Sequence, residues 1–361
     1  MKSSCSQRAL APDLIRCFAF FSVVSVHFFA RSGYYDIVVD GTLMYLQTLL
    51  RSFFMVCVPL FIMLTGYLMR TRPLTLRYFT RITKTLGIYI LASLACIAYR
   101  YLFPKDAVSL AGQLYGIFSF TTAPYSWYIE MYLGLFLLTP FLNILYNNLQ
   151  TQRNKQLLLL VMFIMTALPS VFNIHRPELS WWSNPASDST YYTFLPDWWF
   201  NIYPLTYYFI GCYLSEYPPK CKRLSNLLLL LASVILVGSF NYYRSHGATF
   251  IWGLWQDYGS AWVLLLSVLT FNLFLLGDYQ NVPNGLRRIL AKLSDWCLGA
   301  YLLSWIFDDI FYPMLIQWIP EFPQRILFFP VIVPAICLCS LVGSAVLNVI
   351  NRPCQKVCDR I

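Results

Sequence analysis

The chain has 361 residues, of which 58% are hydrophobic, 18% aromatic and only 12% charged. An average soluble domain is about 45–50% apolar and about 25% charged, so this composition excludes a disordered chain and an ordinary soluble enzyme. It indicates a protein that crosses the bilayer many times. The formal net charge of +10 fits cytoplasmic loops rich in Lys and Arg, and we expect no nucleic-acid partner because the sequence has no basic soluble domain.

Apolar stretches of about 20 residues, long enough to span a bilayer, recur along the whole chain. They predict an all-α integral membrane protein with about ten transmembrane helices, in a single domain that covers residues 1–361. Proline residues interrupt the fifth and sixth stretches. The stretches lie near residues 10–30, 43–69, 82–103, 126–146, 156–173, 198–216, 225–243, 257–277, 296–317 and 326–351.

The Lys and Arg residues alternate between the two sides of this predicted bundle. An even number of spans puts both termini on one side, and that side holds most of the basic residues, from Lys2 and Arg8 to Arg352. Cytoplasmic loops carry the excess of Lys and Arg. We therefore predict that both termini are cytoplasmic.

The sequence contains 11 cysteines, which lie in predicted spans or on the predicted cytoplasmic side. We expect no disulfides, since these form in oxidising compartments. The pair Cys354 and Cys358 has no second pair at the spacing of a zinc site, so we also expect no metal.

The first predicted helix carries three ionisable residues, Asp13, Arg16 and His27. Such residues cost about 2.5–3.5 kcal/mol each within a span, which makes them functional candidates. Asp13 and Arg16 can pair on one face, and His27 returns to the same stripe about three helical turns later. A histidine changes charge near neutral pH, which suits proton transfer. The alternative is an interfacial ion pair and a histidine that hydrogen-bonds a neighbouring helix.

Four more charged residues fall in the outer halves of predicted spans: Arg51, Glu130, Asp308 and Asp309. Arg51 and Glu130 are candidates to orient His27 or to bind substrate. Asp308 and Asp309 fit a position at the outer interface as well as a buried role.

The third predicted helix opens with a basic run, Arg77, Arg81 and Lys84. Spacings of four and three residues put these side chains on one face, where they can hold a phosphorylated ligand. The alternative, which composition alone favours, is topological charge or contact with anionic lipids. The sequence has no Walker loop and no G-x-G-x-x-G motif, so nothing supports an ATPase or a Rossmann cofactor site.

At these residues the sequence resembles membrane acyltransferase family 3. Residues 13–27 are similar to the family's D-x-L-R-x-x-A first helix with its later histidine, and residues 58–68 are similar to its V-P-L-F-F-x-x-S-G-Y-L block. Residues 78–89 resemble the basic start of its third helix, and residues 127–140 resemble its W-[FY]-L…P helix. The resemblance spans most of the chain.

Two positions depart from the family pattern. Glu130 stands nearer to the tryptophan of the fourth span than the family's acidic residues do. Ser304 occupies the place of the histidine in the family's Y-L-x-H motif.

The resemblance implies a multi-pass O-acyltransferase of the bacterial plasma membrane. Such an enzyme moves an acyl group, usually acetyl, from cytoplasmic acetyl-CoA to a hydroxyl of a carbohydrate or lipid-linked glycan. In this chain His27 would act as general base or accept the acyl group, while Asp13 and Arg16 orient the first helix and the CoA end. Glu130 or Arg51 would orient His27 or the acceptor. The residues assigned to the CoA phosphates are Arg77, Arg81 and Lys84.

Other functions are compatible with the same residues. The main alternative is a glycan or lipid transporter or flippase, in which His27 and Arg51 line the path. A third is a catalytically inactive sensory or scaffold homologue. The sequence is also compatible with a homo-oligomer.

Overall fold

The computed structural model describes residues 8–104, 109–173 and 192–358, with residues 176, 178 and 182–187 between them, and it describes side chains up to residue 352. The described chain is a bundle of α-helices. Its only extended pairing is two isolated β-bridges, which join Val38 to Thr249 and Val39 to His246. The predicted all-α class is therefore confirmed.

In the described residues, 8 helical segments are long and apolar enough to cross a membrane. Three of the 8 segments contain a short break, between α2 and α3, between α4 and α5, and between the 3-10 helix η4 (Leu254–Gln256) and α13, and the last segment begins with the 3-10 helix η5 (Phe322–Phe328). The helices of these segments are α1 (Leu10–Ser32), α2 (Gly41–Phe54), α3 (Cys57–Met69), α4 (Leu76–Thr80), α5 (Ile82–Leu102), α7 (Trp127–Asn148), α12 (Arg223–Ser245), α13 (Ala261–Leu275), α14 (Asn284–Trp318) and α15 (Phe329–Cys358).

The fifth and sixth predicted spans correspond to shorter helices. The fifth is divided into α8 (Gln152–Thr166) and α9 (Pro169–Phe172), and the sixth is α11 (Tyr203–Glu216). α8 has 15 residues, which is about 22 Å at ~1.5 Å per residue, against a hydrocarbon core of about 30 Å. Pro169 begins a new helix because it lacks the N–H that would continue α8. The described chain also contains the short helix α6 (Leu110–Phe118).

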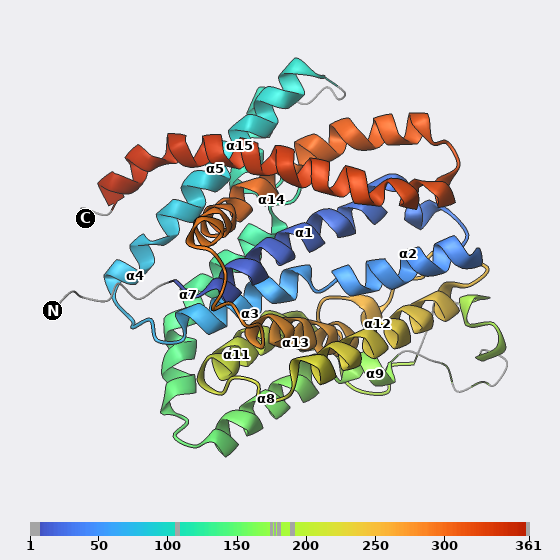
Figure 1. The fold of residues 1–361 in the computed structure, drawn as a ribbon, viewed down its shortest axis with the longest axis horizontal. Helices are drawn as coiled ribbons and strands as arrows, with labels where there is room; N and C mark the ends of the chain where they lie inside the picture. Colours follow the sequence, from blue (N-terminus) through green and yellow to red (C-terminus); the bar gives the residue numbers. More distant parts are fainter. Residues whose placement is uncertain are drawn as a thin grey trace.

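α1 lies in the middle of the bundle (Figure 1). It packs against α14 and α15 on one side and against α2 and α3 on the other. α12, α13, α11 and α8 form the opposite half of the molecule from α15 in the same view. The ionisable residues of α1 are therefore surrounded by other helices.

Two glycines allow α3 and α11 to cross at very short range. A Cβ atom at Gly66 would collide with the backbone oxygen of Tyr208, and one at Gly211 would collide with that of Met63. Small residues at such crossings let helix backbones approach closely in membranes. This contact fixes α3, whose side chains form one wall of the cavity described below.

The two ends of the described chain lie at the same end of the bundle. Asn351 near the end of α15 donates a hydrogen bond to the backbone oxygen of Lys84, 3.3 Å away. Arg16 near the start of α1 donates to Ser294 near the start of α14, 2.6 Å away. This agrees with termini on one side of the membrane, whereas their cytoplasmic orientation stays a prediction.

Candidate active site

His27 sits beside a buried carboxylate on α14. Its Nδ1 atom lies 3.2 Å from Oδ2 of Asp308, whose side chain has no exposed area. The side chain of His27 itself is 15% exposed, so it is enclosed without being sealed. A carboxylate at this distance can orient the imidazole and stabilise the positive charge that develops when a general base takes up a proton.

Tyr125, in the segment before α7, completes this site. Its ring centroid lies 3.8 Å from that of His27, and its hydroxyl donates a 2.7 Å hydrogen bond to Oδ2 of Asp308. The same hydroxyl accepts a hydrogen bond from Nε of Arg31 at 3.2 Å. Burial and the Asp308 carboxylate raise the pKa of Tyr125 well above its usual value. The hydroxyl therefore stays protonated and continues to donate to Asp308 at alkaline pH.

The partner of His27 differs from the residues that the sequence suggested. Glu130 is exposed on α7, and its side chain makes no hydrogen bond or ion pair with any residue in the described part of the chain. Arg51 is buried elsewhere, against Tyr35. Asp308 lies beside His27 instead, and of the two positions that the sequence left open for it, the outer interface and a buried place, the structure shows the buried one. The reason is that α14 packs along α1 and buries the face that carries Asp308.

Two further residues near His27 are Asp309, for which the sequence left two positions open, and Tyr125, for which it made no prediction. Asp309 is half-buried, and it accepts a hydrogen bond of 2.9 Å from the hydroxyl of Tyr99. Tyr125 carries no charge and stands outside the predicted spans, so no periodicity or composition signal singles it out.

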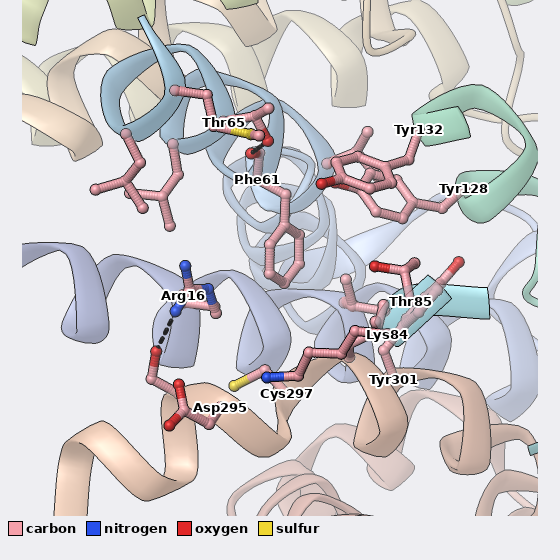
Figure 2. Close-up of a pocket in the computed structure, with 17 residues that line it drawn as sticks. Arg16, Phe61, Thr65, Lys84, Thr85, Tyr128, Tyr132, Asp295, Cys297 and Tyr301 are labelled. Atoms are coloured by element: carbon pink, nitrogen blue, oxygen red, sulfur yellow. Dashed lines mark hydrogen bonds between the residues drawn. The ribbon is translucent and has the colours of Figure 1, made fainter. Parts of the chain in front are cut away.

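A first cavity, here called the inner cavity, opens between α1, α3, α5, α7 and α14 and has a volume of about 310 Å³. Two cations line it, Arg16 and Lys84. Figure 2 shows the Lys84 side chain extended across this space towards Cys297, with Arg16 on the far side. The hydroxyls of Thr65, Thr85 and Ser294 and the aromatic rings of Phe61, Tyr128 and Tyr132 supply much of the remaining wall.

The charges at the start of α1 form a small network. Nη1 of Arg16 lies 3.8 Å from Oδ1 of Asp13, so the predicted pairing of these two residues is confirmed. Arg8 contacts the same oxygen of Asp13 at 2.5 Å and Asp295 at 3.0 Å. This network ties α1 to α14 and holds the Arg16 guanidinium at the wall of the inner cavity.

The three basic residues near the start of α5 do not act as one face. α4 ends at Thr80 and α5 begins at Ile82, with Arg81 in the turn between them. Arg77 and Arg81 are exposed and do not line the inner cavity, whereas Lys84 does. The three residues were predicted to share a helix face that binds a ligand, and in this structure only Lys84 reaches the cavity.

The inner cavity extends towards His27. Val23, which lies one helical turn before His27 on α1, is part of its wall, and so is Tyr301. The hydroxyl of Tyr301 donates a hydrogen bond to the backbone oxygen of Tyr125. The wall of the cavity is thus in direct contact with the residue that stacks on His27.

A second cavity, here called the outer cavity, has a volume of about 530 Å³. Val26, the neighbour of His27 in the sequence, lines it together with Arg51, Trp127 and Trp252. α1 therefore borders the inner cavity through Val23 and the outer cavity through Val26. His27 itself lines neither cavity, but it lies next to Val26 and one helical turn after Val23 on the same helix.

In the described part of the chain, no group of three or more His, Cys, Asp and Glu residues is placed to hold a metal ion. The family model for acyltransferase family 3, described as an acyltransferase domain, matches residues 10–349, which is nearly the whole chain. No curated protein and no solved structure matches the sequence. The matched range contains α1 with His27, the inner cavity and Asp308. The chain therefore belongs to acyltransferase family 3.

Proposed function

We propose that this membrane acyltransferase is an acyl-CoA-dependent O-acyltransferase that moves an acetyl group to a hydroxyl of a carbohydrate-type acceptor. The observation that carries the proposal is the position of His27, which lies beside the buried carboxylate of Asp308 and close along α1 to residues that line two cavities. Family membership supplies the reaction class. The separation of the cavities supports a donor that enters from one side of the membrane and an acceptor that enters from the other.

The inner cavity has the chemistry of a site for the acyl-CoA donor. Lys84 and Arg16 are cations suited to phosphate groups, and the apolar and hydroxyl-bearing wall suits the pantetheine arm. A volume of about 310 Å³ is at the lower end of small-molecule sites, which fits the arm and the acyl group with the nucleotide outside. The positive-inside prediction assigns this end of the bundle to the cytoplasm, where acetyl-CoA is made.

In the proposed reaction, His27 takes the proton from the acceptor hydroxyl, and the oxygen attacks the carbonyl carbon of the thioester. The C–S bond breaks, and CoA leaves as a thiol after it receives the proton from His27. Asp308 stabilises the imidazolium between these two transfers. A two-step route in which His27 first carries the acyl group uses the same residues and leaves an acyl-histidine intermediate.

We place the protein in the plasma membrane of a bacterial cell, with the acceptor in the cell envelope. The 8 apolar helical segments and the family match support a multi-pass membrane protein. The distribution of Lys and Arg supports cytoplasmic termini.

The donor site is tested by titrating acetyl-CoA into the purified protein in detergent, followed by calorimetry. Lys84→Ala removes a charge-assisted hydrogen bond, worth about 1.5–3 kcal/mol, so the Kd should rise about 10- to 100-fold. Arg77→Ala, an exposed cation outside the cavity, is the matched control and should keep the wild-type Kd. His27→Ala should bind acetyl-CoA normally and lose transfer.

Two results would contradict the proposal. One is a folded wild-type protein that does not bind acetyl-CoA, which would make a glycan or lipid transporter the better account of the two cavities. The other is acyl transfer by His27→Ala at the wild-type rate.

A further inference from the structure

We infer that the outer cavity selects an acceptor that carries an anion, a sugar with a carboxylate or a phosphate group, and that Arg51 binds this anion. The inference rests on the proposed function, because it takes the outer cavity as the acceptor site of the same transfer. The observations behind it are the burial of the Arg51 side chain, its two nitrogens without a partner in the described structure, and the aromatic rings around it.

Arg51 is a fully buried cation, and no residue in the described part of the chain forms an ion pair with it. Its exposed fraction is 0%, and it forms part of the wall of the outer cavity. Its Nε atom donates to the hydroxyl of Tyr35 at 3.2 Å, but Nη1 and Nη2 have no hydrogen-bond partner in the described structure. A buried charge is normally paired, because taking it out of water is costly. The two free nitrogens form the fork that binds a carboxylate or phosphate in a bidentate manner.

Aromatic rings cover the guanidinium in place of an anion. Its carbon lies 4.7 Å from the ring centroid of Phe250 and 5.0 Å from that of Trp252. Trp252 is 58% exposed, so it covers Arg51 from the outside and has free space to move into. Cation–π contacts are weaker than a bidentate charge-assisted pair. An anion that displaces Trp252 from Arg51 therefore gains a stronger contact than the one it breaks.

The rest of the outer cavity suits a sugar ring. Trp127 and Tyr258 stack at 5.8 Å and both line the space with Tyr35, which offers flat apolar faces with polar edges. The other charged residue of the wall is Asp257, which is exposed. Its carboxylate is placed to accept hydrogen bonds from sugar hydroxyls, while Arg51 takes the anionic substituent.

The position of the cavity relates this anion site to the reaction. Val26 of the wall is adjacent to His27, and Trp127 is two residues from Tyr125, which stacks on His27. An acceptor held at Arg51 by its anion can therefore present a hydroxyl towards His27. The charge on the acceptor fixes its orientation, so Arg51 determines both which sugar binds and which hydroxyl is acylated.

The test uses pairs of sugars in which one member carries the anionic group and the other is neutral. Glucuronate is compared with glucuronamide, and glucose 1-phosphate with glucose, by their effect on the thermal unfolding midpoint of the full-length protein in detergent. The wild-type midpoint should rise with the anionic member of at least one pair and not with its neutral partner. Arg51→Gln should lose this shift and Arg51→Lys should keep part of it. Arg100→Gln, a cation outside the outer cavity, should keep all of it.

The outcomes are distinguishable. A shift with glucuronate alone identifies a uronic acid acceptor, and a shift with glucose 1-phosphate alone identifies a sugar phosphate. Equal shifts with both members of each pair, no shift with any sugar, or an anion-dependent shift that persists in Arg51→Gln would overturn the inference. If Arg51→Gln does not purify as a folded protein, the comparison of the pairs on wild type and Arg51→Lys still decides the anion dependence.

A transfer assay separates this inference from the proposed function. With acetyl-CoA as donor, Arg51→Gln should raise the KM for the anionic acceptor at least about tenfold, as expected when a charged hydrogen bond is lost, and leave the Kd for acetyl-CoA unchanged. Loss of acetyl-CoA binding by the wild type would contradict the proposed function instead, while the thermal shifts would still report on Arg51.

Discussion

At the residue scale, His27 depends on groups from three separate parts of the chain. The histidine comes from α1, Asp308 from α14 and Tyr125 from the segment before α7. The helical spacing of Asp13, Arg16 and His27 could be predicted from the sequence, since it is a property of one helix. The pairing of His27 with Asp308 could not, because it depends on how α1 and α14 pack, and Glu130 was an equally charged candidate.

The Asp308→Asn variant tests the role of this carboxylate. The change keeps the shape of the side chain and removes the charge that stabilises the imidazolium. In other histidine bases such a change costs up to about 10⁴-fold in kcat, so we expect a loss of between about 10- and 10⁴-fold with little change in the KM for acetyl-CoA. Steady-state kinetics of CoA thiol release would measure both. Asp309→Asn, on the next residue, should keep kcat, and an Asp308→Asn enzyme with wild-type kcat would rule out the orienting role.

At the element scale, the crossing of α3 and α11 gives a structural reason for the glycine in residues 58–68, the block that resembles a motif of the family. Gly66 belongs to the V-P-L-F…T-G-Y-L block, and it is needed because the α11 backbone at Tyr208 approaches it closely. Thr65 of the same block donates to the backbone oxygen of Phe61 at 2.9 Å and lines the inner cavity. One block therefore serves helix packing and the cavity wall together.

The Gly211→Ala variant tests this crossing. The added methyl group meets the backbone of α3 at Met63, and overpacking of this kind costs about 1–3 kcal/mol. We expect a lower thermal unfolding midpoint and weaker acetyl-CoA binding, since α3, which forms one wall of the cavity, must shift relative to α11. Gly134→Ala on α7, where a Cβ meets nothing within 4 Å, is the control. Equal midpoints for the two variants would show that the contact does not matter.

The short helices show a limit of hydropathy as a guide to elements. The stretches 156–173 and 198–216 are apolar enough to suggest spans, but α8 and α11 have only 15 and 14 residues. Proline positions decide this, because Pro169 begins α9 and Pro204 lies at the start of α11. The break at Arg81 likewise separates Arg77 from Lys84, which a continuous helix would have placed on one face.

At the scale of the whole molecule, the proposed reaction depends on which end of the bundle faces the cytoplasm. The helices and their order follow from apolar stretches, which composition reveals directly. The two cavities cannot be predicted from the apolar stretches, because each is formed by residues from several helices that are distant in the sequence. The orientation rests on the alternation of Lys and Arg and is a prediction of its own.

Cys221 offers a direct test of this orientation. It is exposed, and it lies between α11 and α12 in a loop predicted to be cytoplasmic. In a variant with Cys5, Cys354 and Cys358 replaced by serine, a membrane-impermeant maleimide should label Cys221 in inside-out vesicles and not in intact cells. Cys221→Ser provides the background. Labelling in intact cells would invert the topology and place the inner cavity outside.

We propose that acyl-CoA bound at the inner cavity acylates an acceptor that enters from the opposite side of the membrane, with His27 as the base. The most direct measurement supplies radiolabelled acetyl-CoA, which does not cross membranes, to sealed vesicles of known orientation and follows label into the glycan fraction. The account predicts incorporation in inside-out vesicles that contain the wild-type protein, and none in right-side-out vesicles or with His27→Ala. Equal incorporation in both orientations, or with His27→Ala, would contradict it.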